Sequence, residues 1–366
     1  MTTEVKIGMI GTSGIARIGH LPSLIHHPKA KVVAICGRNK ETADEVAKEF
    51  NIPAVFSAYR EMIDKAGLDA VVIATPEDLH HPMTMAALGA KLHVLCEKPL
   101  ALTLEQATEM YETAQSADLI HATFFTFRWY PWNRYFKELI ETGYVGRPFH
   151  FAMRWPYASF QKTDDYHWKR DKARSTGALG GAGSHLIDMA RWIFGDVRRV
   201  GATVKTFRPV VDPEMSSVET SNDSAIVTLD FVNGVHGVID VGSARHAGVQ
   251  PYASVSGENG RLGLIMEPPG GPPIMGAQGE EDELKPIEIP DRFYEGVDRT
   301  KSGFELIMEI IKKQPIGGYA FVDSILNNKV VPPSFYEGLK TQEIIDAAFR
   351  SDETNTLVTL GAHRYE

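Results

Sequence analysis

The alternation of short apolar runs with helical patterns in the first third of the chain constrains its fold more than any other feature. We expect strands at residues 6–10, 31–36, 69–75, 92–96 and 120–125. Residues 41–50, after the capping residue Asn39, have apolar side chains at helical spacing. Because strands that alternate with helices form parallel sheets, the pattern predicts an α/β domain with a doubly wound parallel sheet over residues 1–126.

Longer segments of alternating polarity follow residue 127. They predict strands at residues 148–155, 200–207, 224–231, 235–241 and 252–256, and helices at 133–141, 183–193, 302–313 and 336–350. Residues 267–291 are rich in Pro, Gly and acidic side chains, which is typical of an excursion between strands. We therefore expect residues 127–366 to form an α+β domain with a large, mainly antiparallel sheet.

The composition excludes several classes of protein. With 43% hydrophobic and 23% charged residues the chain resembles an ordinary globular protein, and we expect neither a membrane-spanning run nor a signal peptide. Only Cys36 and Cys96 are present, which argues against a disulfide scaffold or a thiolate metal site. The net charge of −9 disfavours nonspecific nucleic-acid binding. We expect a cytoplasmic protein with no metal, nucleic-acid or membrane partner.

A glycine-rich turn follows the first expected strand and precedes a helix. Such a turn lets the backbone approach a pyrophosphate at a helix N-terminus. The dinucleotide pattern is imperfect, because Ser13 replaces its middle glycine and Ala16 takes its third position. The turn is therefore a candidate cofactor site, formed by Gly11, Thr12, Ser13, Gly14 and Ile15.

The end of the second strand bears on the choice of cofactor. NAD sites place an acidic residue here, whereas this chain has Arg38 and Lys40. A guanidinium can pair with a 2′-phosphate, so we predict a preference for NADP, with NAD as a possible cofactor. The alternative is a solvated Arg38 beside a helix cap.

Two further strand ends supply candidate cofactor residues. Thr75 and Pro76 begin a turn that we expect to line the ribose or nicotinamide together with His80, although His80 could equally be an exposed helix residue. Glu97 and Lys98 follow the run at 92–96, where a strand end delivers side chains to the cofactor. Lys98 is a candidate for proton transfer, and the alternative is a surface lysine.

Taken in order, these motifs resemble the Gfo/Idh/MocA oxidoreductase family over nearly the whole chain. The resemblance rests on the Gly11–Ala16 turn, Ala74–His80, Glu97-Lys98-Pro99, Phe127-Arg128-Trp129, Gly177–Asp188 and the tail Phe335–Ser351. It implies a Rossmann domain and a second domain whose open sheet mediates dimers or tetramers. It also implies hydride exchange between a nicotinamide cofactor and a sugar, cyclitol or similar polyol.

The resemblance also implies two catalytic residues. Lys98 matches the family's active-site lysine, and His185 matches the histidine that contacts the reacting hydroxyl as acid or base. The aspartate expected four residues before His185 is Gly181 here, so substrate recognition must differ. The acids that could replace it are Asp164, Asp165, Asp171 and Asp188.

Aromatic and basic residues crowd the segments near residues 128 and 168. We expect Trp168 and Lys169 to form a wall of the substrate site and Arg128 to bind polar groups of the substrate, although most of these rings fit a core or an interface. The leading hypothesis is an NADP-preferring dehydrogenase or reductase acting on CH–OH groups of a sugar or polyol. The alternatives are a noncatalytic NADP and sugar sensor, and a glycosidase or lyase with an internally recycled nicotinamide.

Overall fold

The computed structural model describes residues 4–157, 166–210, 218–244, 251–266 and 273–361. The chain forms two compact units. The first contains Met1–Thr126 and Glu295–Lys340, and the second contains Phe127–Tyr294 and Thr341–Glu366.

The first unit is built on a six-stranded parallel sheet in the order β3-β2-β1-β4-β5-β6. All four residues of β4 are buried, because helices cover both faces of such a sheet. The order reverses between β1 and β4, which is where open α/β sheets bind ligands. The strands are β1 (Val5–Ile10), β2 (Ala30–Cys36), β3 (Ala54–Phe56), β4 (Ala70–Ile73), β5 (His93–Cys96) and β6 (His121–Thr123).

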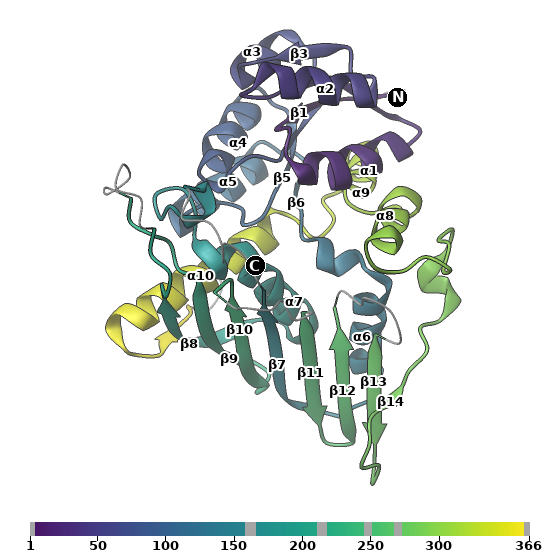
Figure 1. Cartoon of the computed structure of the whole chain (residues 1–366), viewed down its shortest axis with the longest axis vertical. Helices are drawn as coiled ribbons and strands as arrows, with labels where there is room; N and C mark the ends of the chain where they lie inside the picture. The colour runs from purple at the N-terminus through teal and green to yellow at the C-terminus, as the bar shows by residue number, and fades with distance from the viewer. Residues whose placement is uncertain (1–3, 158–165, 211–217, 245–250, 267–272, 362–366) are drawn as a thin grey trace. The chain divides into compact units, whose positions relative to one another are not determined.

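Helices lie on both faces of this sheet, with α1 and α9 on one side and α4 and α5 on the other (Figure 1). The expected cap of α2 is confirmed, since the Asn39 side chain accepts from Thr42 N at 2.7 Å. A short π-helical turn at Ala16–His20 precedes α1. The helices of the N-terminal segment are α1 (Leu21–His26), α2 (Lys40–Phe50), α3 (Tyr59–Lys65), α4 (His80–Gly89) and α5 (Leu104–Ser116).

The first compact unit also contains residues 295–340, which the sequence pattern places in the expected domain at 127–366. This segment contains α8 (Gly303–Lys313) and α9 (Gly318–Leu326), and both helices contact α1. The Gly318 amide donates to Ser23 Oγ at 2.9 Å. The sequence pattern misses this assignment, because contacts between residues 295 positions apart leave no local signal.

The second unit contains a nine-stranded sheet in the order β14-β13-β12-β11-β7-β10-β9-β8-β15. Among the strand pairs of the described residues only β7–β10 is parallel, so the prediction of a mainly antiparallel sheet is confirmed. Its strands are β7 (Pro148–Pro156), β8 (Val197–Lys205), β9 (Ser224–Phe231), β10 (His236–Gly242), β11 (Tyr252–Gly257), β12 (Gly260–Ile265), β13 (Ile274–Gln278), β14 (Lys285–Pro286) and β15 (Val358–Thr359).

The excursion expected at 267–291 is wrong in part, because β13 and β14 lie within it and extend the sheet. The pattern misses them because β13 is short and β14 has only two residues. Residues 267–272 lie outside the described residues.

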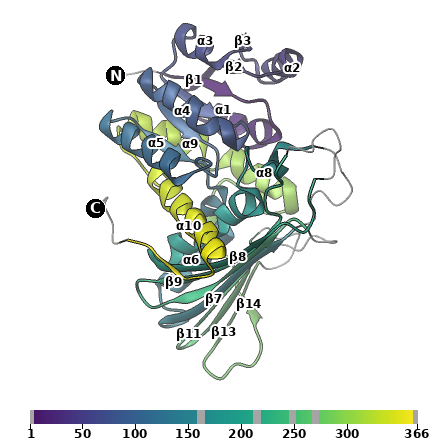
Figure 2. The same cartoon turned by 90° about the vertical axis from the view of Figure 1, so that its left-hand side faces the viewer.

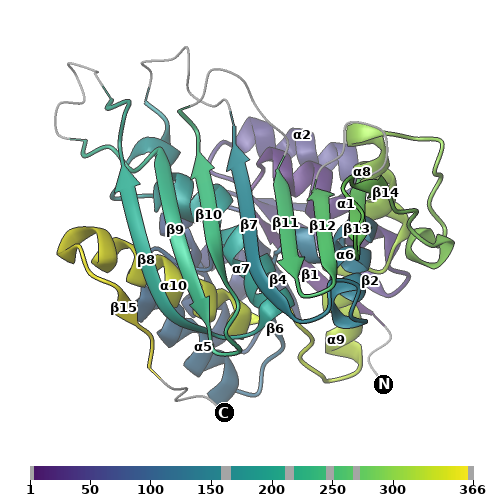
Figure 3. The ribbon, with the colours of Figure 1, turned by 90° about the horizontal axis from the view of Figure 1, so that it is seen from below.

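Helices of the second unit lie on one face of its sheet (Figure 2). They are α6 (Pro131–Glu141), α7 (Ser184–Phe194) and the part of α10 (Phe335–Thr354) from Thr341 onward. Along β9 buried residues alternate with more exposed ones, as expected for a sheet covered on one face. Figure 3 looks onto the opposite face, which no described helix of this unit covers. Within the described residues, no helix is long and apolar enough to cross a membrane.

Candidate active site

The glycine turn lies where the carboxyl ends of β1, β2 and β4 meet. The Gly11 amide donates to Cys36 O, and the Ser13 hydroxyl donates to Ala74 O at 3.2 Å. Gly11 has a φ of +115°, and a Cβ there would lie 2.2 Å from Ala74 O, so no other residue fits. A Cβ on the exposed Gly14 would meet no atom within 4 Å. The turn is therefore closed toward the sheet and open above Gly14, which fits the approach of a pyrophosphate.

The end of β2 packs against this turn. A Cβ at Gly37 would lie 2.7 Å from the Thr12 methyl carbon, so the two segments touch through a glycine. Arg38 follows and is exposed, whereas the Lys40 ammonium pairs with Asp44 at 2.7 Å. The basic side chain that directly follows Gly37 is therefore exposed.

His80 lies inside the first unit and is only 1% exposed. Its Nδ1 lies 2.8 Å from Pro99 O and its Nε2 lies 3.1 Å from Thr75 O. Burial lowers the pKa of His80 although both carbonyls act in the opposite direction, and a neutral ring donates to one of them at a time. The expectation of an exposed His80 is wrong. The cofactor contact stays a prediction, and both ring nitrogens lie near backbone carbonyls of two separate loops.

Glu97 and Lys98 directly follow β5. Glu97 is 7% exposed, and its Oε1 lies 2.8 Å from Nε2 of His20, a residue that the sequence analysis missed. Its Oε2 accepts from the Lys98 backbone amide at 3.2 Å. The Glu97 carboxylate is thus engaged by protein groups, whereas the half-buried Lys98 stands at the carboxyl end of the strand. The Lys98–Pro99 peptide bond is cis.

The glycine-rich segment before His185 folds into a π-helical turn, Leu179–Gly183, that leads into α7. Asn222 holds its start, because Asn222 O accepts from Ala178 N at 2.9 Å and Asn222 Oδ1 accepts from Leu179 N at 3.0 Å. Gly177 has a φ of +69°, and a Cβ there would lie 2.4 Å from Asn222 O. Asn222 is a second residue that the sequence analysis missed, since it lies on a distant segment.

The His185 ring is 7% exposed and lies among aromatic side chains of the second unit. Phe127 stacks on it with ring centroids 4.6 Å apart, and Trp155 lies tilted at 6.1 Å. These contacts limit rotation of the imidazole. A general acid or base must hold its ring nitrogen in a fixed direction to transfer a proton.

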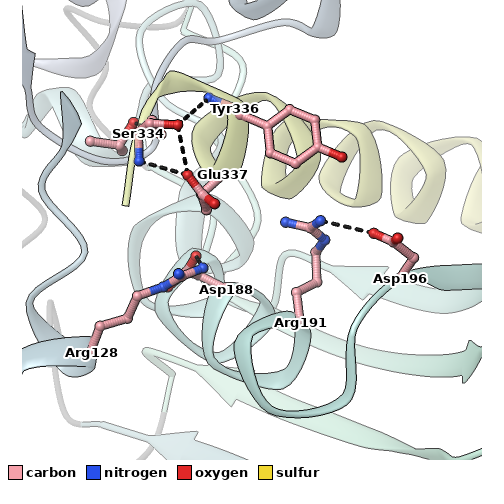
Figure 4. Close-up of polar contacts among 8 residues, drawn as sticks. Arg128, Asp188, Arg191, Asp196, Ser334, Tyr336 and Glu337 are labelled. Carbon is pink, nitrogen blue, oxygen red and sulfur yellow. Dashed lines mark hydrogen bonds and ion pairs between the residues drawn. The ribbon is translucent and has the colours of Figure 1, made fainter. Parts of the chain in front are cut away.

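The Arg128 guanidinium forms a buried ion pair with Asp188. Arg128 Nε and Nη2 donate to the two carboxylate oxygens of Asp188 at 2.8 and 2.6 Å, and both side chains are buried (Figure 4). The guanidinium also lies over the Trp192 ring at 5.7 Å. The predicted substrate contact of Arg128 stays a prediction, with Nε and Nη2 engaged by Asp188. Asp188 is equally engaged, so it is not a simple replacement for the acid missing at position 181.

The other candidate substrate residues are placed as follows. Lys169 Nζ lies 5.6 Å from the centroid of the Trp168 ring, so the expected pair is adjacent. Asp171 accepts from the Tyr166 hydroxyl at 3.0 Å and from Ala173 N at 3.0 Å. A Cβ at Gly181 would meet no atom within 4 Å, so the position has room for a side chain. Asp164 and Asp165 lie outside the described residues.

Two family models match the chain. Residues 5–125 match the NAD-binding Rossmann fold of an oxidoreductase family, and residues 137–360 match its C-terminal alpha/beta domain. The chain belongs to the Gfo/Idh/MocA oxidoreductase family. The predicted family, fold class and oxidoreductase class are thereby confirmed, and binding of a nicotinamide cofactor is confirmed at the level of the family.

In the described residues no group of three or more His, Cys, Asp or Glu is arranged to hold a metal.

Relatives of this Gfo/Idh/MocA protein include named sugar and polyol dehydrogenases. The levoglucosan dehydrogenase of Pseudarthrobacter phenanthrenivorans is 33% identical over 218 residues, 58% of this chain and 54% of its own length. The myo-inositol 2-dehydrogenase of Thermotoga maritima is 30% identical over 257 residues, 69% of this chain and 74% of its own length. A solved levoglucosan dehydrogenase in complex with NADH and levoglucosan shares the fold, with a TM-score of 0.84 at 24% identity over 97% of this chain and 99% of that chain.

Proposed function

We propose that this protein is an NAD(P)-dependent dehydrogenase or reductase that acts on a CH–OH group of a sugar, cyclitol or related polyol, or on the matching keto-sugar. The observation that supports it most is Lys98, held directly after β5 at the carboxyl edge of the NAD-binding sheet. Ligands of open α/β sheets bind at this edge. The sugar and polyol dehydrogenases among its relatives support the substrate class.

The residues present fit a nicotinamide dinucleotide. In the proposal, the backbone from Gly11 to Ile15 holds the pyrophosphate, with Thr75 and Pro76 beside the ribose or nicotinamide. When bound, the nicotinamide supplies the hydride acceptor or donor. Lys98 and His185 handle the proton of the reacting hydroxyl, and Trp168 with Lys169 contacts the rest of the substrate.

We further propose that the open face of the second unit's sheet mediates a homodimer or homotetramer. Ile226 on β9 is 50% exposed, and several neighbours on this face are partly exposed. The proposal is supported by the sheet face itself, because a face that no described helix of this unit covers can pack against the sheet of a second copy.

Arg38 supports a preference for NADP. Arg38→Asp is expected to weaken NADPH binding by about 10- to 100-fold and to spare NADH, because a charge-assisted hydrogen bond is replaced by repulsion of the 2′-phosphate. Fluorescence titration of both nucleotides measures this change. The matched control is Arg60→Asp, which alters another exposed arginine of the same unit. Unchanged nucleotide preference would show that Arg38 only faces solvent.

Turnover tests the proposed reaction itself. Protein stripped of nucleotide should bind NADPH and change the nicotinamide absorbance with at least one member of a panel of polyols and keto-sugars. Binding without turnover across the panel would favour a noncatalytic sensor of NADP and sugar. Product formation without net change in cofactor absorbance would indicate a glycosidase or lyase with an internally recycled nicotinamide.

A further inference from the structure

Buried side chains, rather than the sheet, hold the peptide that contains Lys98. β5 ends at Cys96, and the last backbone contact of this strand end with β4 is Glu97 N to Ile73 O at 3.0 Å. One residue later, Lys98 N donates to the carboxylate of Glu97 at 3.2 Å. On the other side of Lys98, Pro99 O lies 2.8 Å from Nδ1 of His80. The direction in which the Lys98 side chain leaves the backbone therefore depends on Glu97 and His80.

Glu97 depends in turn on His20. The His20 ring is fully buried, packs against Phe124 with centroids 3.8 Å apart, and reaches Glu97 Oε1 with Nε2 at 2.8 Å. A carboxylate only accepts, so Nε2 bears the hydrogen of this contact. Nδ1 of His20 has no hydrogen-bond partner among the described residues. Within that part of the chain, the ring therefore makes its hydrogen bond through Nε2, to Glu97. The carboxylate thus joins the His20 imidazole to the Lys98 amide.

Glu97 is suited to accept both contacts. Burial by itself raises the pKa of this carboxyl, but the hydrogen bond from His20 and the nearby Lys98 ammonium help to outweigh burial and lower it. An ionised carboxylate accepts two directional hydrogen bonds and costs several kcal/mol to bury without them. Loss of the His20 contact should therefore displace Glu97 and loosen the Lys98 peptide with it.

Both histidines also connect this peptide to the predicted cofactor loops. His20 ends the π-helical turn that follows the glycine turn, and His80 reaches Thr75 O at 3.1 Å. From this geometry we infer that His20 is a positioning residue, which acts through Glu97 to fix the backbone of Lys98 relative to the nucleotide-binding turn. The inference rests on the catalytic role proposed for Lys98.

Chemical labelling tests the inference without a substrate. Competitive acetylation with trace acetic anhydride, followed by peptide mass spectrometry, measures the reactivity of Lys98 against a surface reference such as Lys65. His20→Leu should raise the relative reactivity of Lys98 by about threefold or more, equivalent to roughly 0.7 kcal/mol, because the released amine becomes more accessible. His20→Gln, whose amide nitrogen can replace Nε2, should restore the wild-type value.

A second buried histidine provides the matched control. His27 is 4% exposed, and its Nε2 lies 3.3 Å from a carboxylate oxygen of Asp323. Among the described residues, no hydrogen bond joins it to the Lys98 peptide. His27→Leu should lower the melting temperature without changing Lys98 reactivity. If His20→Leu lowers the melting temperature and leaves Lys98 reactivity unchanged, His20 is merely structural and the inference fails.

Two further measurements keep the test decisive. Glu97→Gln preserves the side-chain volume and should also raise Lys98 reactivity, so it replaces His20→Leu if that variant does not fold. No change in Glu97→Gln would overturn the inference. With a substrate from the panel, His20→Leu should lower kcat more than it weakens NADPH binding. If no substrate is turned over, the labelling result stands alone, so failure of the proposed function and failure of the inference remain distinguishable.

Discussion

Lys98→Met should lower kcat for the substrate found in the panel by about 10²–10⁴-fold, the usual contribution of a positioned acid or base. Methionine keeps most of the side-chain length and removes the ammonium, so the change isolates the proton-transfer group. Because the pyrophosphate is held elsewhere in the proposal, by the Gly11–Ile15 turn, NADPH should still bind with a Kd within about threefold of the wild-type value. Steady-state kinetics and fluorescence titration measure the two quantities separately.

The control for this variant is Lys65→Met. Lys65 lies on α3 and pairs with Glu61 at the surface at 2.9 Å, away from the strand ends. Its replacement should leave kcat unchanged. Loss of NADPH binding in Lys98→Met would make Lys98 a cofactor residue, and undiminished turnover would remove it from the mechanism.

Asp188→Asn should lower the free energy of unfolding by about 3–5 kcal/mol, the usual cost of breaking a buried ion pair. The Arg128 guanidinium would remain buried beside a neutral amide, without the carboxylate that now accepts from both Nε and Nη2. Denaturant titration followed by circular dichroism measures the change. Since α7 contains both Asp188 and His185, the same variant should also lower turnover.

A double variant separates charge from packing. Arg128→Met with Asp188→Leu removes both charges and should recover most of the lost stability, because apolar groups of similar volume replace buried ion pairs at little cost. The matched control is Asp196→Asn, which breaks the Arg191–Asp196 pair at the end of the same helix (Figure 4). Asp196 is 38% exposed, so this change should cost only about 1 kcal/mol or less. Equal losses in the two single variants would contradict the importance of burial.

Local sequence signals predicted the structural elements that depend on short segments of the chain. The Asn39 cap of α2 and the strand at 224–231 follow directly from side-chain type and spacing. β3 has only three residues, which is too short to show a strand period. β12 lies just before the segment 267–291 and the short β13 lies within it, where the Pro and Gly content obscured the strand pattern.

Side chains whose partners are distant in sequence were beyond such reasoning. Arg128 was expected at the substrate because a basic residue among aromatics suggests polar recognition, yet Asp188, 60 residues later, pairs with it. His80 was expected at the cofactor or in solvent, yet it is buried between two carbonyls.

The sequence by itself determined the two kinds of sheet, the glycine turn, and the positions of Lys98 and His185 in the motifs that identify the family. These features depend on periodicity and on neighbouring residues, which a linear chain displays. Only the tertiary structure decided that Glu97 meets His20 across 77 residues, that Asn222 anchors the glycine-rich segment, and that 295–340 packs with the first unit. The physical reason is that a buried polar group requires a partner, but topology alone determines which distant residue supplies it.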